Sequence, residues 1–150
     1  MFPLMRGVVL LTAFVTGAQS TIADEGDHHS GEMRMLGDCS GCVIHDADYS
    51  DARLAGIDFT GAELTGVRFD RASMSIAVFD GATLDGLSFE GANLQGASFV
   101  ETHLRNVSFQ DADLEGAVFE NAVLSETDLY VAELCKTQLP DDQMVTRDCN

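Results

Sequence analysis

Large apolar residues recur at every fifth position along most of the chain. In DGLSFEGANLQGASF, residues 85–99, Phe89, Leu94 and Phe99 each follow a small or apolar residue two places earlier. A step of five scatters such residues around a helix axis, and in a continuing strand an odd step alternates them between opposite faces. The pattern therefore predicts a chain that bends once per repeat and turns each large residue toward a common axis.

The repeat runs almost without interruption from residue 44 to residue 139. Each of twenty consecutive five-residue units has one large apolar residue, which we call the central residue, and phenylalanine alternates with leucine or methionine from Leu54 to Leu124. The central residues are Ile44, Tyr49, Leu54, Phe59, Leu64, Phe69, Met74, Phe79, Leu84, Phe89, Leu94, Phe99, Leu104, Phe109, Leu114, Phe119, Leu124, Leu129, Leu134 and Leu139. We expect all of them to point into one core.

Two other positions of the unit also have a consistent character. The residue two places before the centre is usually alanine or another small or apolar residue, as at Ala92 and Ala97, so it should also point inward. The residue two places after the centre is often glycine, aspartate or asparagine. Because these residues tolerate a positive φ, the pattern predicts a corner at each unit boundary.

The units A-E-L-T-G at 62, A-N-L-Q-G at 92 and A-D-L-E-G at 112 resemble the Ala-(Asp/Asn)-Leu-x-x signature of the pentapeptide-repeat proteins. The resemblance covers residues 42–139 and implies an all-β fold, a right-handed quadrilateral β-helix with four units per coil and about five coils. Residues twenty apart would then stack in ladders about 4.8 Å apart. The sequence agrees with two aromatic ladders: Tyr49, Phe69, Phe89 and Phe109, and Phe59, Phe79, Phe99 and Phe119. We expect these side chains to fill the interior and to leave no space for a substrate.

The N-terminal residues 1–23 have the character of a secretory signal peptide. A single arginine precedes an apolar run at 7–15, and small residues follow it. The run is too short to span a membrane, and small residues permit cleavage after Ser20 or Ala23. We therefore expect a periplasmic or secreted protein with no membrane insertion after signal cleavage.

The remaining segments complete the expected domain organisation. We predict a flexible acidic linker at 24–38, the β-solenoid at 39–139 and a C-terminal cap tail at 140–150. Translation starting at Met33 or Met35 would instead leave the protein in the cytoplasm.

Four cysteines in an exported chain favour two disulfides. Cys39 falls on a central position and Cys42 on the inward position of the next unit, so both should cap the first coil; the pattern leaves open whether they bridge each other. C-S-G-C could also be a redox pair or half a zinc site, but no second CxxC accompanies it. Cys135 and Cys149 bracket a tail that resembles the endings of some exported pentapeptide-repeat proteins, which implies a bridge closing the other end.

The charge of the chain restricts its partners. The formal net charge is −17, and residues 42–139 contain 17 acidic and 5 basic residues, so we expect no direct binding to nucleic acid. The resemblance implies one alternative, because some members of the family mimic a DNA duplex and bind gyrase, a type II topoisomerase. Such a mimic must work in the cytoplasm, which an exported protein would leave. Otherwise the acids keep a strand-rich surface soluble.

The sequence predicts no catalytic site and no cofactor. His103 occupies an outward position, and Ser88, Ser98 and Ser108 belong to the repeat without a paired histidine. His28 and His29 lie among acids, so a weak metal site in a periplasmic protein is a third interpretation beside a solvated linker.

An interaction surface is predicted where outward positions are apolar instead of polar. The residues of this predicted strip are Ile76, Val78, Val100, Val118 and Val123. The strip would bind an unidentified protein partner or a second copy as a homodimer, and the alternative is that isolated surface valines simply suit a strand. We therefore expect an exported, non-enzymatic scaffold that acts as a protein-interaction or structural module.

Overall fold

Seven short strands make up the regular secondary structure of residues 37–150, the part of the chain that the computed structural model describes. They are β1 (Val43–His45), β2 (Glu63–Thr65), β3 (Thr83–Asp85), β4 (His103–Arg105), β5 (Val123–Ser125), β6 (Thr137–Gln138) and β7 (Met144–Val145). These residues contain no α-helix, and hence no helix that could cross a membrane. The expected signal peptide, most of the expected linker, and His28 and His29 lie outside the described residues.

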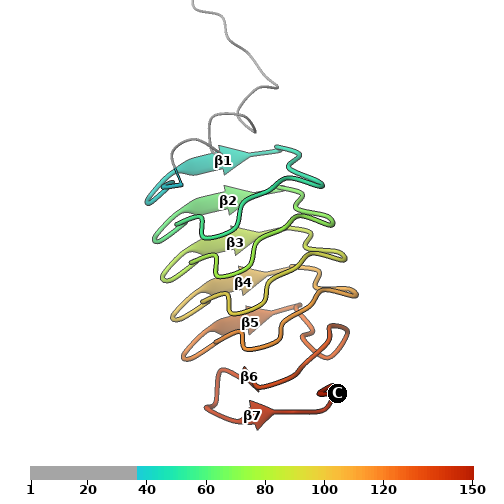
Figure 1. Cartoon of the computed structure of the whole chain (residues 1–150). Helices are drawn as coiled ribbons and strands as arrows, with labels where there is room; N and C mark the ends of the chain where they lie inside the picture. Colours follow the sequence, from blue (N-terminus) through green and yellow to red (C-terminus); the bar gives the residue numbers. More distant parts are fainter. Residues whose placement is uncertain (1–36) are drawn as a thin grey trace, which may run out of the picture.

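Strands β1 to β5 stack in chain order as one parallel sheet (Figure 1). Each strand pairs with the next at a spacing of twenty residues, as in Ile44 with Leu64 and Leu104 with Leu124. The sheet therefore spans four full turns of chain, and partial turns on both sides of it extend the solenoid toward the five coils expected. Single bridges on the other sides, such as Arg53 with Ser73, keep the same spacing. The predicted four-sided, all-β solenoid is confirmed.

Aromatic ladders fill the interior as the repeat predicts. Phe79, Phe99 and Phe119 stack with ring centroids 4.8 and 4.6 Å apart, and the Phe89 and Phe109 rings lie 5.3 Å apart in the other ladder. The two ladders meet edge to face, for example at 5.8 Å between Phe99 and Phe109. All the phenylalanines from Phe59 to Phe119 are fully buried, so aromatic packing excludes water along most of the axis.

The inward position two places before the central residue is buried in every unit from Ile57 to Ala122, and it is half-buried at Ala47, Ala52 and Thr127 near the ends. Alanines such as Ala72, Ala92 and Ala112 occupy it in most coils. Thr102 and Thr137 replace alanine there, and their hydroxyls donate hydrogen bonds to the carbonyls of Phe79 and Leu114 at 2.7 and 2.8 Å. A buried hydroxyl is therefore tolerated because it has a backbone acceptor.

The corners require a left-handed backbone. From residue 41 to residue 136, every fifth residue has a positive φ except Val131, as the repeat predicts. Glycine fills many of these corners, but Ile76 adopts a φ of 55° at one of them. A β-branched residue rarely takes this conformation, so this corner is strained.

The regular winding changes in the last coil. The Asp111 N–H donates to the Val131 carbonyl at 3.1 Å, one residue further along than the equivalent bonds above it, such as that from the Arg71 N–H to the Glu90 carbonyl. The ordinary spacing returns with the bond from the Leu114 N–H to the Glu133 carbonyl, and β6 continues the coil through a parallel bridge between Gln138 and Val118. Strand β7 then pairs antiparallel with β6 and lies below it (Figure 1). The tail therefore forms a lid over part of the last coil.

Candidate functional site

The structure does not bring the predicted strip residues together. Val78 and Val118 lie in one outward ladder, with Ser98 between them. Val100 lies on the other side of the buried Phe99, and its N–H donates to Asp80 Oδ1 at 3.1 Å. Val78 and Val118 therefore lie two coils apart with a serine between them, and Val100 belongs to the neighbouring column of outward residues.

The remaining two strip residues are exposed but separate. Ile76 is 64% exposed at its corner, where it lies over Gly56 and Gly96. Val123 is 51% exposed on β5, which belongs to another side of the solenoid. A binding role for the strip stays a prediction. A partner would have to contact exposed side chains such as Ile76 and Val123 separately, because they do not form a continuous apolar surface.

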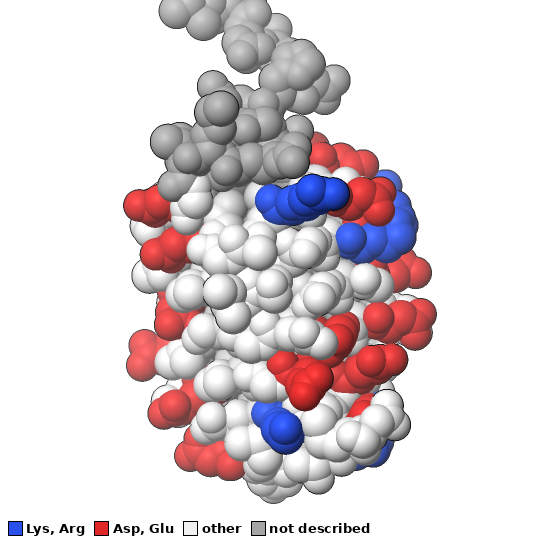
Figure 2. Space-filling model, viewed as in Figure 1, with Lys and Arg blue, Asp and Glu red and all other residues white. Residues whose placement is uncertain are grey.

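Carboxylates dominate the outer surface. Figure 2 shows acidic side chains along both edges of the visible face, with few charges in its centre. Four arginines pair with aspartates: Arg68 with Asp48 and Asp70, Arg71 with Asp51, Arg105 with Asp85 and Arg147 with Asp148. Because four of the six basic side chains in residues 37–150 are paired in this way, the surface of this part of the chain presents a net negative potential to a partner.

Asp70 is the most buried carboxylate on the outside of the coils. Its side chain is 6% exposed, and it accepts hydrogen bonds from Ser88 Oγ at 2.5 Å and from Arg68 at 2.6 Å. Burial raises the pKa of Asp70, but the bonds from Ser88 and Arg68 outweigh it, so the net pKa lies below the ordinary value. The cluster links two neighbouring coils through a charged network.

The outward serines and histidine of the repeat do not form a cluster. The Ser88 and Ser98 hydroxyls donate to Asp70 and Asp80, whereas Ser108 Oγ accepts from the Gln110 N–H. His103 is exposed on β4, in line with a threonine and a valine of the adjacent strands. Within residues 37–150, no three histidine, cysteine or acidic side chains are placed to hold a metal.

Both ends of the solenoid carry a disulfide. Cys39 is bridged to Cys42 in the first coil, and Cys135 to Cys149 below the last one. C-S-G-C therefore forms a local bridge in this structure.

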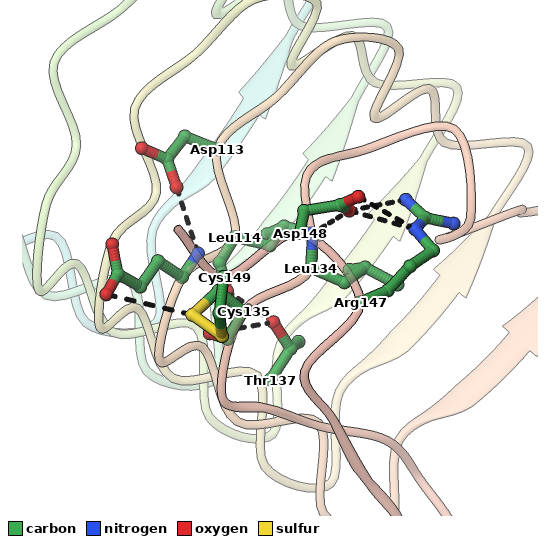
Figure 3. The surroundings of a disulfide bond; sticks show 9 residues. Asp113, Leu114, Leu134, Cys135, Thr137, Arg147, Asp148 and Cys149 are labelled. Atoms are coloured by element: carbon green, nitrogen blue, oxygen red, sulfur yellow. Dashed lines mark hydrogen bonds and ion pairs between the residues drawn. A yellow bond between two sulfur atoms is a disulfide. The ribbon is translucent and has the colours of Figure 1, made fainter.

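The tail beyond Cys135 completes hydrogen bonds that a further coil would otherwise make (Figure 3). The Asp148 N–H donates to the Leu134 carbonyl at 3.0 Å, and Asp148 Oδ2 accepts from the Leu134 N–H at 2.8 Å. The Arg147 guanidinium donates to the carbonyls of Tyr130 and Ala132 at 3.2 and 2.8 Å. Sequence reasoning found the disulfide but missed Arg147 and Asp148, because they stand outside the repeat.

These features define a class of protein: a β-solenoid whose four sides are built from five-residue units around a filled core. Family models of the pentapeptide repeat region and of pentapeptide repeats (8 copies) match residues 62–139 and 38–75. The chain belongs to the pentapeptide-repeat family.

Two solved structures have a similar fold. HetL, a pentapeptide repeat protein involved in heterocyst differentiation regulation in the cyanobacterium Nostoc sp. strain PCC 7120, is 29% identical with a TM-score of 0.68; the match covers 72% of this chain and 51% of HetL. Rfr23 from the cyanobacterium Cyanothece 51142 is 19% identical with a TM-score of 0.59, over 73% of this chain and 92% of Rfr23.

A more distant similarity concerns QnrB1, a plasmid-mediated fluoroquinolone resistance protein. It is 25% identical with a TM-score of 0.43, over 65% of this chain and 52% of that one. No curated protein sequence shows significant similarity to the chain.

Proposed function

We propose that this protein is an exported, non-enzymatic pentapeptide-repeat module that acts by binding another protein. The observation that carries the proposal is the filled interior: central residues from Phe59 to Phe119 are at most 1% exposed. A narrow, side-chain-filled solenoid has no internal site for a small substrate, so a specific function must use the outer surface or the ends.

Export is supported by the cysteines and by the N-terminal sequence. All four cysteines are paired in disulfides, which persist in oxidising compartments and are rare in the cytosol. Residues 1–23 have the charge, length and small-residue pattern of a signal peptide. The disulfides would then protect both ends of the solenoid outside the cytoplasm.

A protein partner is favoured over nucleic acid by the charge. The formal net charge of −17 repels phosphate, and the arginines of the described solenoid are largely paired with aspartates. A solenoid instead offers long ladders of side chains with fixed spacing, which suit a protein surface.

Fractionation of cells that express the full chain with a C-terminal tag tests the proposal. We expect a processed chain whose mass corresponds to cleavage after Ser20 or Ala23, with no thiol free to alkylation, in the extracytoplasmic fraction. A Leu10→Arg variant, which interrupts the apolar run, should stay unprocessed and serves as the control. In-cell crosslinking of the processed protein should then recover a specific protein.

Two results would overturn the proposal. An unprocessed, reduced wild-type chain in the cytoplasm would remove export and return the topoisomerase-binding mimic as the leading hypothesis. A stoichiometric metal in the processed protein, lost on substitution of His28 and His29, would favour the metal-binding alternative.

A further inference from the structure

One edge of the last coil is left without a partner strand. Strand β5 pairs with β4 on one side, and no strand of residues 37–150 pairs with it on the other. Of the residues that follow β5 by twenty places, Met144 and Val145 form β7, which pairs antiparallel with β6 instead. The tail therefore forms hydrogen bonds with the backbone beneath Leu134, but it provides no strand that pairs with β5 beneath Leu124.

Backbone groups along this edge lack the bonds that their equivalents make in every coil above. The carbonyls of Cys42, Ala62, Ala82 and Thr102 each accept from an N–H of the next coil, but the Ala122 carbonyl accepts no such bond within the described chain. The N–H groups of Asp46, Gly66, Gly86 and Asn106 donate to the next coil, whereas that of Glu126 has no backbone acceptor there. An unpaired strand edge of this kind is a template for another strand.

An apolar pocket lies beside the free edge. It has a volume of about 340 Å³, and Leu124, Leu129, Leu139 and Pro140 supply its apolar walls. Leu64, Leu84 and Leu104, which precede Leu124 in the same ladder, are at most 1% exposed, but Leu124 is only half-buried. The core ladder thus ends on a leucine that the described chain covers only in part, and the space beneath it would take one further large apolar side chain.

The rim of the pocket has a negative charge. Asp128 and Asp141 both line it, and each uses one carboxylate oxygen to accept a turn hydrogen bond, from the N–H groups of Tyr130 and Gln143 respectively. The ring of Tyr130, which is 58% exposed, also lines the pocket. A second copy of this acidic chain would bring like charges together, whereas a segment with lysine or arginine would match the rim.

We propose that the free edge of β5 is a docking site for an extended segment of another protein, with a large apolar side chain between basic residues. The segment adds a parallel strand below β5. Its backbone donates to the Ala122 carbonyl and accepts from the Glu126 N–H, and its apolar side chain continues the ladder below Leu124. The proposal rests on the proposed function, because it names the site and chemistry of the partner of a protein-interaction module.

Fluorescence anisotropy with a blocked, labelled peptide, Lys-Thr-Leu-Thr-Arg, tests this site on the full chain with its disulfides intact. Binding is expected to weaken at least tenfold when serine replaces the leucine. It should weaken to a similar extent when the nitrogen of the threonine before leucine is methylated, since this removes the donor to the Ala122 carbonyl. Equal binding of the methylated peptide would overturn the strand-pairing geometry.

A matched pair of variants tests the charge of the rim. Asp128→Asn with Asp141→Asn keeps the turn hydrogen bonds but neutralises the rim, so peptide affinity should fall at least fivefold. Asp58→Asn with Asp113→Asn makes the same change at equivalent turns on the sides of the solenoid, where Asp58 and Asp113 accept from the N–H groups two residues later. Equal losses in both variants, or no binding by wild type, would overturn the proposal.

In-cell photocrosslinking separates this inference from the proposed function. A photoreactive residue at position 130 should capture a partner protein, whereas one at the exposed position 90 on the side should not. Capture from position 90 alone would retain a protein-interaction module but exclude this end as its site. Capture of a second copy from position 130 would replace the peptide-like partner with a dimer and overturn the inference.

Discussion

Replacing Phe99 with alanine is the sharpest test of the aromatic core. Phe99 is fully buried in the middle of its ladder, with ring centroids 4.8 Å from Phe79 and 4.6 Å from Phe119. It also meets Phe89 and Phe109 edge to face at 6.2 and 5.8 Å. The substitution removes four aromatic contacts and leaves a cavity in a stack that its neighbours cannot easily close.

The expected cost follows from these contacts. Truncation of a buried phenylalanine to alanine lowers the free energy of unfolding by about 3–5 kcal/mol. We expect the upper part of that range, because two stacked pairs and two edge-to-face pairs are lost and each is worth about 0.5–1.5 kcal/mol beyond area burial. Phe99→Leu should cost about half as much, because leucine fills part of the space, as it does at the central positions of the aliphatic ladders.

Urea unfolding monitored by circular dichroism measures the effect, with both disulfides kept intact. Val100→Ala is the matched control, because Val100 is adjacent but half-buried, and it should cost at most about 1 kcal/mol. A solenoid gains stability from contacts between neighbouring coils, so Phe99→Ala should also lower the m-value if the two halves uncouple. A cost for Phe99→Ala no larger than that of Val100→Ala would refute the ladder as the source of stability.

Three further predictions concern the ends, a corner and a charged cluster. Cys135→Ala with Cys149→Ala should lower the free energy of unfolding by about 3 kcal/mol on the chain-entropy model, measured against wild type in urea; an unchanged midpoint would show that the cap needs no bridge. Ile76→Gly should raise stability by about 0.5–1 kcal/mol in thermal melts, because relief of a left-handed isoleucine, worth about 1–2 kcal/mol, exceeds the entropic cost of glycine; a lower melting temperature would contradict this. The pKa of Asp70 is depressed in the folded state, so its stabilisation is present above the unfolded pKa of about 3.9 and is lost as the pH falls through the lower folded pKa. Asp70→Asn should therefore reduce the melting temperature at pH 7, and the difference from wild type should shrink below about pH 4; a constant difference down to pH 2 would rule out the ionised carboxylate as its cause.

The inside and the outside of the solenoid could be predicted from the sequence. Each unit has the same local pattern, so the period of five residues predicts which side chains point inward. Each coil stacks on the coil before it, so the period of twenty residues predicts which side chains are neighbours along the axis. Phe89 and Phe109 therefore stack as their spacing predicts, and the corner positions take the positive φ that glycine and aspartate indicated. The contacts between neighbouring coils can be predicted because they recur at one separation in the sequence, twenty residues.

The sequence did not predict in the same way which outward side chains lie next to one another around a coil. Val78 and Val100 are both outward and apolar, but they flank the buried Phe99 ladder on different columns, and Asp80 bonds to the backbone of Val100. The repeat specifies which residues point outward, whereas lateral neighbours depend on the direction in which the chain leaves each corner. Their distances were decided only by the folded coil.

The ends of the solenoid were likewise decided only by the tertiary structure. Arg147 and Asp148 replace a missing coil beneath Tyr130, Ala132 and Leu134, yet nothing periodic in the sequence indicates these contacts. The same tail leaves the Ala122 carbonyl and the Glu126 N–H without a backbone partner in the described chain, next to the half-buried Leu124. A repeat determines how each coil meets the next, but it contains no information about where stacking stops, because the last coil has the pattern of the others and differs only in what the tail covers.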